Sequence, residues 1–481
     1  MKQRNKKNKL VQAKSVISKD LKRINRNVAG MDIGAHSIFV CAGASNNDLT
    51  VFEVPTFTAD LKALVKKLLA LGVVSVAMEA TGIYWITMYD MLQEATIEVW
   101  LVNPRDIKAI PGKKTDVLDC QRIQQLHSYG LLNRSFRPEK EIVVLRSYTR
   151  QRTTLTELAA MQINHMHKAL VQMNVQIGQV VSDIAGATGM LIIRAIAAGE
   201  HDPLVLAKHR DRRCKSSESI IAKSLEGNYK PEHLLALKQA LEIYDLLKQK
   251  IVECEEALKK SLKVLITSDD SSGMGSRKSM VTDKPSTAAE STQRSKRKVN
   301  KSSYSFDATA LIVHYAGVDL TTLPGISENT AVKVITEIGI DMSRWQGSKQ
   351  FASWLGLCPG NTVSGGKILS SQTKPTNNKV AQALRVAAST LYNSKTALGA
   401  YLRRLSGRIG KQKAITATAH KLAVYSYCML RDKKNYLDIG GEAYERQYEK
   451  RVVLSITKRA ADLGYDLIKR DNPSNDCSLA A

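Results

Sequence analysis

The sequence predicts an α/β plus α protein: one mixed α/β domain followed by a mainly helical remainder. From Val28, short apolar runs are separated by glycines and an Asn-Asn pair, and they then alternate with segments of helical spacing. From about Glu139, apolar residues recur every three or four positions over stretches nearly free of proline and glycine. A chain of 481 residues is long enough for two to four domains.

The α/β domain is expected over residues 28–130, after a basic arm at residues 1–27 that lacks an apolar run. Three strands of antiparallel type open it. A helix that stops at Gly72 follows, and then the buried strand "VVSVAMEA", the helix "GIYWITMYDMLQEA" and the buried strand "IEVWLVN". This order predicts a sheet that begins antiparallel and continues in alternating strand and helix units.

Residues 131–265 are expected to form a helical, coiled-coil region. The segment from Glu139 to Asp183 contains a single glycine and no proline, which predicts one long helix. A second run, Pro231 to Leu265, has the apolar stripe and charged flanks of a coiled-coil arm. Together they predict a helical hairpin and a homo-oligomer.

Residues 266–305 are rich in Ser, Thr and Lys and poor in apolar residues, so we expect a disordered linker. Its basic run from Arg294 to Lys301 is a candidate phosphate contact. Residues 306–431 are expected to fold as a compact, mainly helical domain. Residues 432–481 are charged and weakly periodic, which predicts a helical tail.

The charge balance favours a polyanionic partner. Lys and Arg number 71 against 45 Asp and Glu, which gives a net charge of +26. Such a surplus neutralises phosphates and releases counterions, so nucleic acid is the leading class of ligand. The alternatives are a ribosome-associated protein or a protein that is simply basic.

The cysteines and the hydropathy argue for a reducing, cytoplasmic location. The seven cysteines contain no close pair, which speaks against a zinc ribbon and against a disulfide framework. No stretch approaches the roughly 20 apolar residues of a spanning helix, and the basic arm does not resemble a signal peptide. We therefore expect no membrane contact.

Four carboxylates stand out in the α/β domain. Asp32 lies in the first strand within "GMDIG", where the flanking glycines would let a ligand approach the backbone. Glu79 ends a buried strand, where open α/β sheets bind ligands. Asp116 and Asp119 are three residues apart, on one face of a helix that begins near Thr115. Hard oxygen ligands in this number predict an Mg²⁺ site for phosphodiester chemistry.

Each carboxylate also has a purely structural interpretation. Asp32 could be an edge or turn residue, Glu79 could cap the following helix, and Asp116 could be a first-turn carboxylate favoured by the helix dipole. The metal hypothesis therefore depends on all four acting together.

Three blocks, "MDIG", "EATGIYW" and "NPRDIKAIPGKKTDVLDCQRI", resemble the N-terminal domain of the DEDD-type insertion-sequence transposases, relatives of the Piv DNA invertases. That resemblance implies a RuvC-like domain of the ribonuclease H-like fold. The acidic tetrad of the family would correspond to Asp32, Glu79, Asp116 and Asp119.

The blocks "LTTLPGISENTAVKVITEIG" and "FASWLGLCPGNTVSGGK" resemble the C-terminal domain of the same transposases. That resemblance implies a recombination nucleophile at Ser364, with a phosphoserine link to DNA and an acidic domain that holds Mg²⁺ on the scissile phosphate. It also implies a noncoding bridge RNA that pairs with donor and target DNA, in a homo-oligomer, a dimer or tetramer, at the bacterial nucleoid.

The residues around Ser364 agree with this chemistry without requiring it. Gly365 and Gly366 would let the backbone approach a phosphate, and Lys367 could neutralise one. Ser364 has no obvious local base to activate it. The structural alternative for "VSGGK" is an ordinary hairpin turn.

Other hydroxyls and cations remain open as alternatives. Competing nucleophiles are Ser370, Ser371, Thr373 and Tyr84. The run "YLRRLSGRIGKQK" offers Arg403, Arg404 and Arg408 as a backbone-binding face, though charge runs are commonly just solvated. The turn "LPGIS" either holds a phosphate at a helix N-terminus or simply precedes a helix.

Three functions follow. The first is an RNA-guided DNA recombinase of a mobile element. The second is a RuvC-like metal-dependent nuclease that hydrolyses branched DNA with water as the nucleophile. The third is a nucleic-acid-binding scaffold without enzymatic activity, which the four carboxylates argue against.

Overall fold

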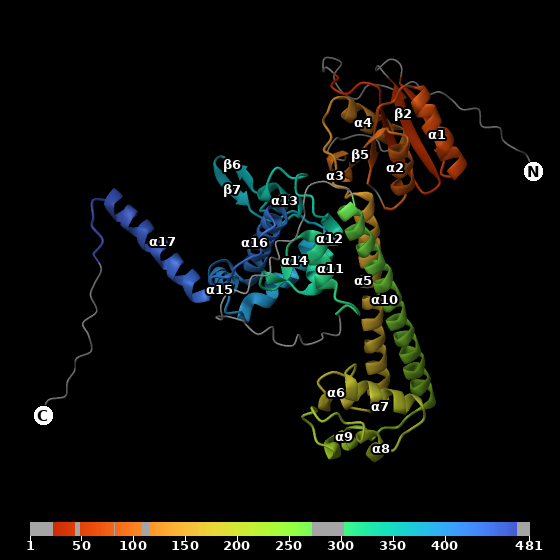
Figure 1. Cartoon of the computed structure of the whole chain (residues 1–481), viewed down its shortest axis with the longest axis vertical. Coiled ribbons are helices and arrows are strands. Elements are labelled where there is room, and N and C mark those ends of the chain that lie inside the picture. Colours follow the sequence, from red (N-terminus) through yellow and green to blue (C-terminus); the bar gives the residue numbers. More distant parts are fainter. Residues whose placement is uncertain (1–22, 44–48, 81, 108–114, 272–302, 469–481) are drawn as a thin grey trace, which may run out of the picture. The chain divides into compact units, whose positions relative to one another are not determined.

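The structure, a computed structural model, describes residues 23–43, 49–80, 82–107, 115–271 and 303–468. The chain divides into two compact units, Met1–Arg137 and Pro138–Ala481 (Figure 1). Much of the predicted basic arm and most of the predicted linker, including the run from Arg294 to Lys301, lie outside the described residues.

Unit 1 is built on a five-stranded sheet in the order β3-β2-β1-β4-β5. The first three strands pair antiparallel, whereas β4 and β5 continue from β1 in parallel. The predicted arrangement of three opening antiparallel strands and then alternating units is confirmed. The strands are β1 (Val28–Ile33), β2 (Ser37–Gly43), β3 (Thr50–Pro55), β4 (Ser75–Glu79) and β5 (Glu98–Val102).

Helices cover both faces of this sheet, and the central strands β1 and β4 are therefore buried on both sides. On one face, α1 (Thr58–Ala70) and α2 (Trp85–Glu94) pack against Met31, Val76 and their neighbours. On the other face, α4 (Asp116–Ser128) packs its Cys120 against Cys41 of β2 and its Ile123 against Ala77 of β4. The short helix α3 (Pro104–Ile107) follows β5.

The packing of α4 on β1 depends on Gly30. A Cβ atom built at Gly30 would lie 2.3 Å from the Gln124 backbone nitrogen and 2.5 Å from the Cys120 carbonyl oxygen. Both distances are far shorter than a van der Waals contact, so only glycine allows this approach. The glycine was expected to admit a ligand. It admits the backbone of α4 instead.

In unit 2, α5 (Lys140–Gln172) and α10 (Pro231–Ser271) pack along one another, which confirms the predicted helical hairpin (Figure 1). The single helix predicted as far as Asp183 is wrong at its end. α5 stops at Gln172 because Asn174 takes a left-handed conformation, with φ at 59°, and the Val175 amide bonds back to the Leu170 carbonyl.

Between α5 and α10, the chain forms a small helical subdomain that sequence analysis did not separate from the arms. Its helices are α6 (Ile177–Val180), α7 (Ala187–Ala197), α8 (Pro203–Ala207) and α9 (Glu218–Ser224). They share one apolar cluster with the adjoining ends of α5 and α10, including Met166, Ile193 and Leu237. The short segments lack the long periodicity that identified the arms, so only their packing reveals the unit.

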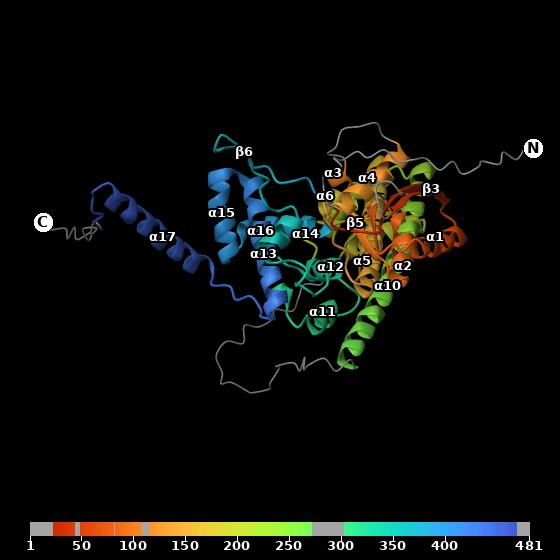
Figure 2. The same cartoon turned by 90° about the horizontal axis from the view of Figure 1, so that it is seen from above.

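The C-terminal part of unit 2 is mainly helical, as expected, and contains one hairpin, β6 (Thr362–Ser364) and β7 (Lys367–Ser370). α14 and α15 both pack on α16 (Figure 2). The predicted helical tail corresponds to α17. The helices are α11 (Ala308–Ala316), η1 (Leu320–Thr322), α12 (Glu328–Ile338), α13 (Ser348–Trp354), α14 (Lys379–Thr390), η2 (Leu391–Asn393), α15 (Ala397–Ile409), α16 (Lys411–Asp432) and α17 (Gly441–Asp462).

Two carboxylates tie this helical part to the arms. Glu337 of α12 accepts a bidentate pair of hydrogen bonds from Arg150 of α5, at 2.7 and 2.9 Å, and pairs with Arg146. Glu255 of α10 is buried and accepts from Arg152 at 2.6 Å and from the Ser305 amide at 2.8 Å. The Arg152 guanidinium also lies over the ring of Tyr304.

Both ends of the predicted linker 266–305 are therefore ordered. Residues 266–271 extend α10, and Tyr304 is buried against Arg152. The sequence did not predict these ordered ends. The segment has a low apolar content, and a single buried tyrosine and a single amide hydrogen bond produce no periodic pattern. Along the described residues, no helix has the length and apolar content needed to cross a membrane.

Replacing Gly30 by Ala is expected to destabilise unit 1 by about 1–3 kcal/mol, because the added methyl group has no room between β1 and α4. The free energy of opening can be measured by hydrogen exchange of the α4 amides. Gly407→Ala is the matched control, since a Cβ there meets nothing within 4 Å. Equal α4 protection in the Gly30→Ala protein and the wild type would contradict the assigned role.

A second prediction concerns pH. Burial lowers the pKa of His127 to about 4, against a weaker opposing effect of Glu98. His127 is 1% exposed, and its Nε2 lies 2.8 Å from the Ser75 hydroxyl. Its pKa in the unfolded chain is near 6.5, so the unfolded state takes up the proton first as pH falls. The free energy of unfolding is therefore highest above pH 6.5, and it falls by about 2 kcal/mol between pH 7 and pH 5.

This loss can be followed through hydrogen exchange of α4 at each pH, in the wild type and in His127→Asn. The variant lacks the titrating imidazole, so its stability should depend less on pH over this range. If both proteins lose the same free energy, then His127 is not the group responsible.

Candidate active site

Asp32 and Glu79 lie side by side at the carboxyl end of the parallel strands. Met31 pairs with Met78 in the register of β1 and β4, and Asp32 and Glu79 are the next residue of each strand. Side chains alternate along a strand, and Gly30 and Ala77 face α4. Asp32 and Glu79 therefore leave the sheet on the α4 side, and both are partly buried.

Asp116 and Asp119 occupy the first turn of α4, as predicted. Thr115 is the N-cap, and its hydroxyl accepts a hydrogen bond from the Leu118 amide at 3.3 Å. Asp116 is exposed and Asp119 is partly buried, with Arg122 at 3.9 Å from its carboxylate. The positive end of the helix dipole favours both carboxylates at this position.

One carboxylate of each pair, Asp32 and Asp119, lies close enough to affect the pKa of Cys120. Burial raises the pKa of Cys120 strongly, and the nearby Cys41, Asp32 and Asp119 raise it further. Burial likewise raises the pKa of Cys41 to about 12. Both thiols are fully buried, where they pack between α4 and the sheet.

The donor set suits a divalent cation chemically, because four carboxylates supply the hard oxygen ligands that Mg²⁺ takes. In the structure these carboxylates form two pairs. One pair lies at the ends of β1 and β4, and the other lies in the first turn of α4. Within the described ranges, no three His, Cys, Asp or Glu side chains are close enough together to hold a metal ion. Residues 108–114, which lead into α4, lie outside those ranges.

Ser364 lies at the end of β6, next to the tip of the hairpin. Gly365 and Gly366 form a two-residue turn with φ at 54° and 76°, which is the conformation of a type I′ turn. Ser364 pairs with Lys367 across the hairpin, and both are exposed. The hairpin turn is therefore also the element that exposes Ser364.

The Ser364 hydroxyl has no hydrogen-bond partner among the described residues, and its cross-strand neighbour is Lys367. The competing hydroxyls are placed differently. Ser370 accepts a hydrogen bond from the Gln372 amide at 3.3 Å, and Thr373 lies in the stem, bridged to Pro359. Ser371 is exposed in the stem after β7, and Tyr84 is exposed at the start of α2, in unit 1.

The three arginines of α15 have different surroundings. Arg403 donates to the carbonyls of Tyr392 and Ser394, at 3.1 and 2.6 Å. Arg404 donates to the Tyr444 hydroxyl at 2.5 Å and lies over the ring of Tyr448, so it joins α15 to α17. Arg408 is exposed. Two of the three therefore hold the fold together in addition to any contact with nucleic acid.

The "LPGIS" turn is used for packing. Gly325 has φ at 83°, and a Cβ there would lie 2.7 Å from the Ala387 carbonyl of α14. Ser327 caps α12 through the Thr330 amide. These contacts favour a turn that precedes a helix over a phosphate site.

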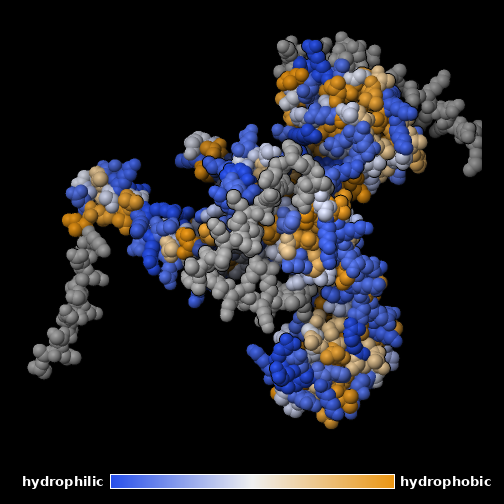
Figure 3. Space-filling model, viewed as in Figure 1, coloured by the Kyte–Doolittle hydropathy of each residue, from blue (hydrophilic) through white to orange (hydrophobic). Residues whose placement is uncertain are grey.

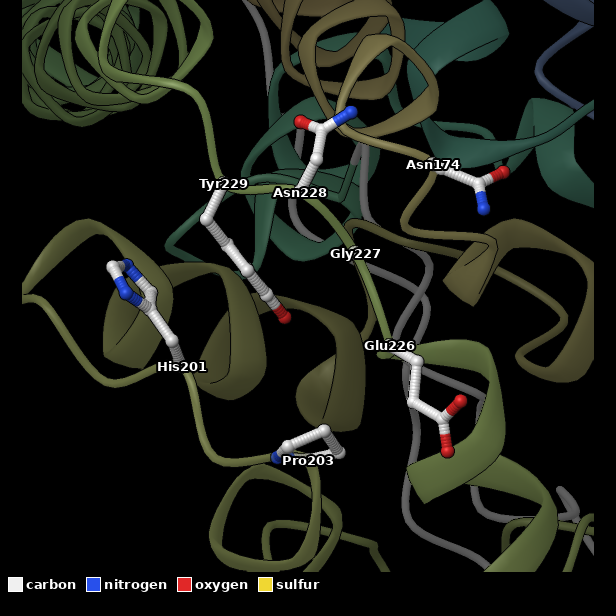
Figure 4. Close-up of a pocket in the computed structure, with 7 residues that line it drawn as sticks. All are labelled: Asn174, His201, Pro203, Glu226, Gly227, Asn228 and Tyr229. Atoms are coloured by element: carbon white, nitrogen blue, oxygen red, sulfur yellow. The ribbon is translucent and has the colours of Figure 1, made fainter.

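A pocket of about 560 Å³ lies in the small helical subdomain, lined by Asn174, His201, Pro203, Glu226, Gly227, Asn228 and Tyr229 (Figure 4). His201 stacks on Tyr229, with 4.4 Å between the ring centroids. The Tyr229 hydroxyl donates to the Leu225 carbonyl, and burial raises the pKa of Tyr229 to about 12. None of the proposed catalytic residues lines this pocket.

Comparison with known proteins bears on both units. Residues 29–175 match a family model described as a transposase of the DEDD, IS110 type. Residues 318–403 match a second model, described as the transposase IS116/IS110/IS902 family. A comparison with curated proteins gave no significant match. The first match contains all four carboxylates and the second contains Ser364, and together the two domains support an IS110-type transposase, an enzyme that acts on DNA.

Proposed function

We propose that the chain is a DNA recombinase of an insertion sequence that cuts and rejoins strands through a phosphoserine intermediate at Ser364. The observation that carries this proposal is the placement of Ser364, which is exposed beside a two-glycine turn and opposite Lys367. This hairpin lies in the segment that matches the second transposase model. A nucleophile that must reach a phosphate in DNA needs this degree of access.

The carboxylates of unit 1 would hold a divalent cation. We propose Mg²⁺, because this ion prefers hard oxygen donors such as these four carboxylates. When bound, the ion would supply Lewis-acid stabilisation of the charge that builds up on the scissile phosphate. Asp32 and Glu79 would contribute from the strand ends, and Asp116 and Asp119 from the first turn of α4. Gly30 keeps the two pairs adjacent by admitting α4.

The chemistry on the serine is a pair of transesterifications. The Ser364 oxygen forms a bond to phosphorus while the bond from phosphorus to a strand oxygen breaks. The serine loses its proton and the leaving oxygen gains one. A strand hydroxyl from another DNA end then attacks the phosphoserine, and Ser364 regains a proton as its bond to phosphorus breaks. The number of phosphodiester bonds is conserved, and Lys367 would neutralise the phosphate throughout.

We further propose that the partners are donor DNA, target DNA and a noncoding bridge RNA that pairs with both. The net charge of +26 supports several polyanionic partners at once. A homo-oligomer, a dimer or tetramer, is supported by apolar side chains that remain exposed along the arms. These include Leu158 and Met161 on α5 and Leu235 and Leu246 on α10.

The alternative function is a RuvC-like nuclease that hydrolyses branched DNA with water as the nucleophile. One observation favours it: among the described residues, the Ser364 hydroxyl makes no hydrogen bond to a base, and all four carboxylates belong to unit 1. In that reaction the carboxylates would carry the whole mechanism, and Ser364 would contribute only to the hairpin.

Ser364→Ala is expected to abolish the covalent protein–DNA adduct and to reduce strand exchange by on the order of 10³-fold or more, because no other group replaces the attacking oxygen. The assay uses end-labelled DNA from around the chain's own gene and a denaturing gel that retains the adduct. Ser370→Ala is the matched control on the same hairpin and should behave like the wild type.

Asp32→Asn in the same assay should also lose the adduct while it still binds DNA. If Ser364→Ala continues to recombine, the serine mechanism is wrong. If Ser364→Ala still cleaves DNA and the wild type forms no covalent adduct, the hydrolytic nuclease is the correct alternative.

The guide RNA is tested by purifying the full chain gently and sequencing the RNA that accompanies it. We expect a discrete RNA transcribed from DNA next to the chain's own gene, because a guide must be made where the element lies. A matched preparation treated with ribonuclease should then lose strand exchange. Recovery of random cellular RNA alone would refute the guided mechanism and leave the serine chemistry to stand on its own test.

A further inference from the structure

We propose that the β6–β7 hairpin enters the major groove of duplex DNA tip first, with an apolar face formed by Val363 and Ile368 against one wall of the groove. This inference rests on the proposed DNA recombinase function and adds to it a second, non-ionic contact. It identifies Val363 and Ile368 as positioning residues for Ser364.

The hairpin has two chemically different faces. Val363 pairs with Ile368 across the strands, and Ser364 pairs with Lys367 at the next position. Because side chains alternate along a strand, the aliphatic pair projects from one face and the serine–lysine pair from the other. One face can therefore address phosphates while the opposite face contacts a less polar surface.

The aliphatic face is exposed among the described residues of unit 2. Val363 is 57% exposed and Ile368 is 62% exposed. Figure 3 shows hydrophobic residues at the surface in the region where Figure 1 labels β6 and β7. An isolated two-stranded hairpin is only marginally stable in water, so a partner that buries this face would also order the serine.

The charge around the hairpin selects nucleic acid as that partner. No aspartate or glutamate occurs between Asp341 and Asp432, a segment that includes the hairpin and α13 to α16. Lys367, Lys374 and Lys379 are exposed in and just after the hairpin. A surface with cations and no carboxylates attracts a phosphate backbone.

The shape of the hairpin suits a groove. The tip consists of Gly365 and Gly366, and a Cβ at either position would meet nothing within 4 Å, so the tip is as thin as a backbone can be. The major groove is about 12 Å wide and admits a two-stranded ribbon. In that position, Ser364 and Lys367 face the phosphates of one strand, and Val363 and Ile368 face sugars and thymine methyl groups on the other side.

The test compares DNA affinity and its salt dependence in variants of the full chain. The probe is a fluorescein-labelled duplex of mixed sequence, and the readout is anisotropy over a series of salt concentrations. In the double variant Val363→Thr/Ile368→Thr we expect about tenfold weaker binding, with the slope of log Kd against log salt unchanged, because the lost contact is apolar. Threonine keeps the β-branch, so the strands should persist.

Two further variants define the result. Lys367→Gln should weaken binding and also reduce the salt slope by about one, since it removes a phosphate contact. Leu204→Thr/Val205→Thr, an exposed aliphatic pair on α8, is the matched control and should bind like the wild type.

Two outcomes would overturn the inference. One is unchanged affinity in Val363→Thr/Ile368→Thr alongside weakened binding in Lys367→Gln. The other is a loss of oligomer mass without loss of DNA affinity, which would assign the face to a second copy of the chain. The result is independent of the serine chemistry, because the anisotropy assay measures DNA affinity and needs no strand exchange.

Discussion

The contact between α4 and β1 at Gly30 is the constraint on which the acidic site depends. Without a side chain at that position, the helix backbone lies directly on the strand, and its first turn comes to the sheet end where β1 and β4 finish. Interiors are packed too tightly to absorb an extra methyl group without movement. The same contact buries Cys120 and His127, so the thiol stays protonated and the imidazole stays neutral.

The distribution of charge divides the chemistry between the two units. The carboxylates that would hold a divalent cation lie in unit 1, whereas the longest acid-free segment around Ser364 lies in unit 2. Carboxylates repel phosphate unless a cation separates them, and an exposed serine is a weak nucleophile without help. In the proposed strand transfer, unit 1 would therefore contribute the carboxylates and unit 2 the serine.

Ion pairs that include buried carboxylates help to hold the serine-bearing part to the arms. Glu337 binds two arginines of α5, and Glu255 binds Arg152 and the ordered end of the linker. Removing one partner from such a buried pair leaves an uncompensated charge, so these contacts define one geometry more sharply than apolar packing would. The hairpin, by contrast, is exposed at every residue of β6 and β7.

The sequence by itself determined the features that follow from a local pattern of residues. Alternating apolar runs predicted the order of strands and helices in the sheet, the carboxylates were placed at strand ends and in a helix's first turn, and Gly365–Gly366 predicted a turn beside Ser364. Tertiary structure alone decided that Gly30 admits α4 and not a ligand, that Arg404 joins α15 to α17, and that Val363 and Ile368 stay exposed among the described residues. These features depend on which residues meet across tens or hundreds of positions, and such contacts leave no period in the sequence.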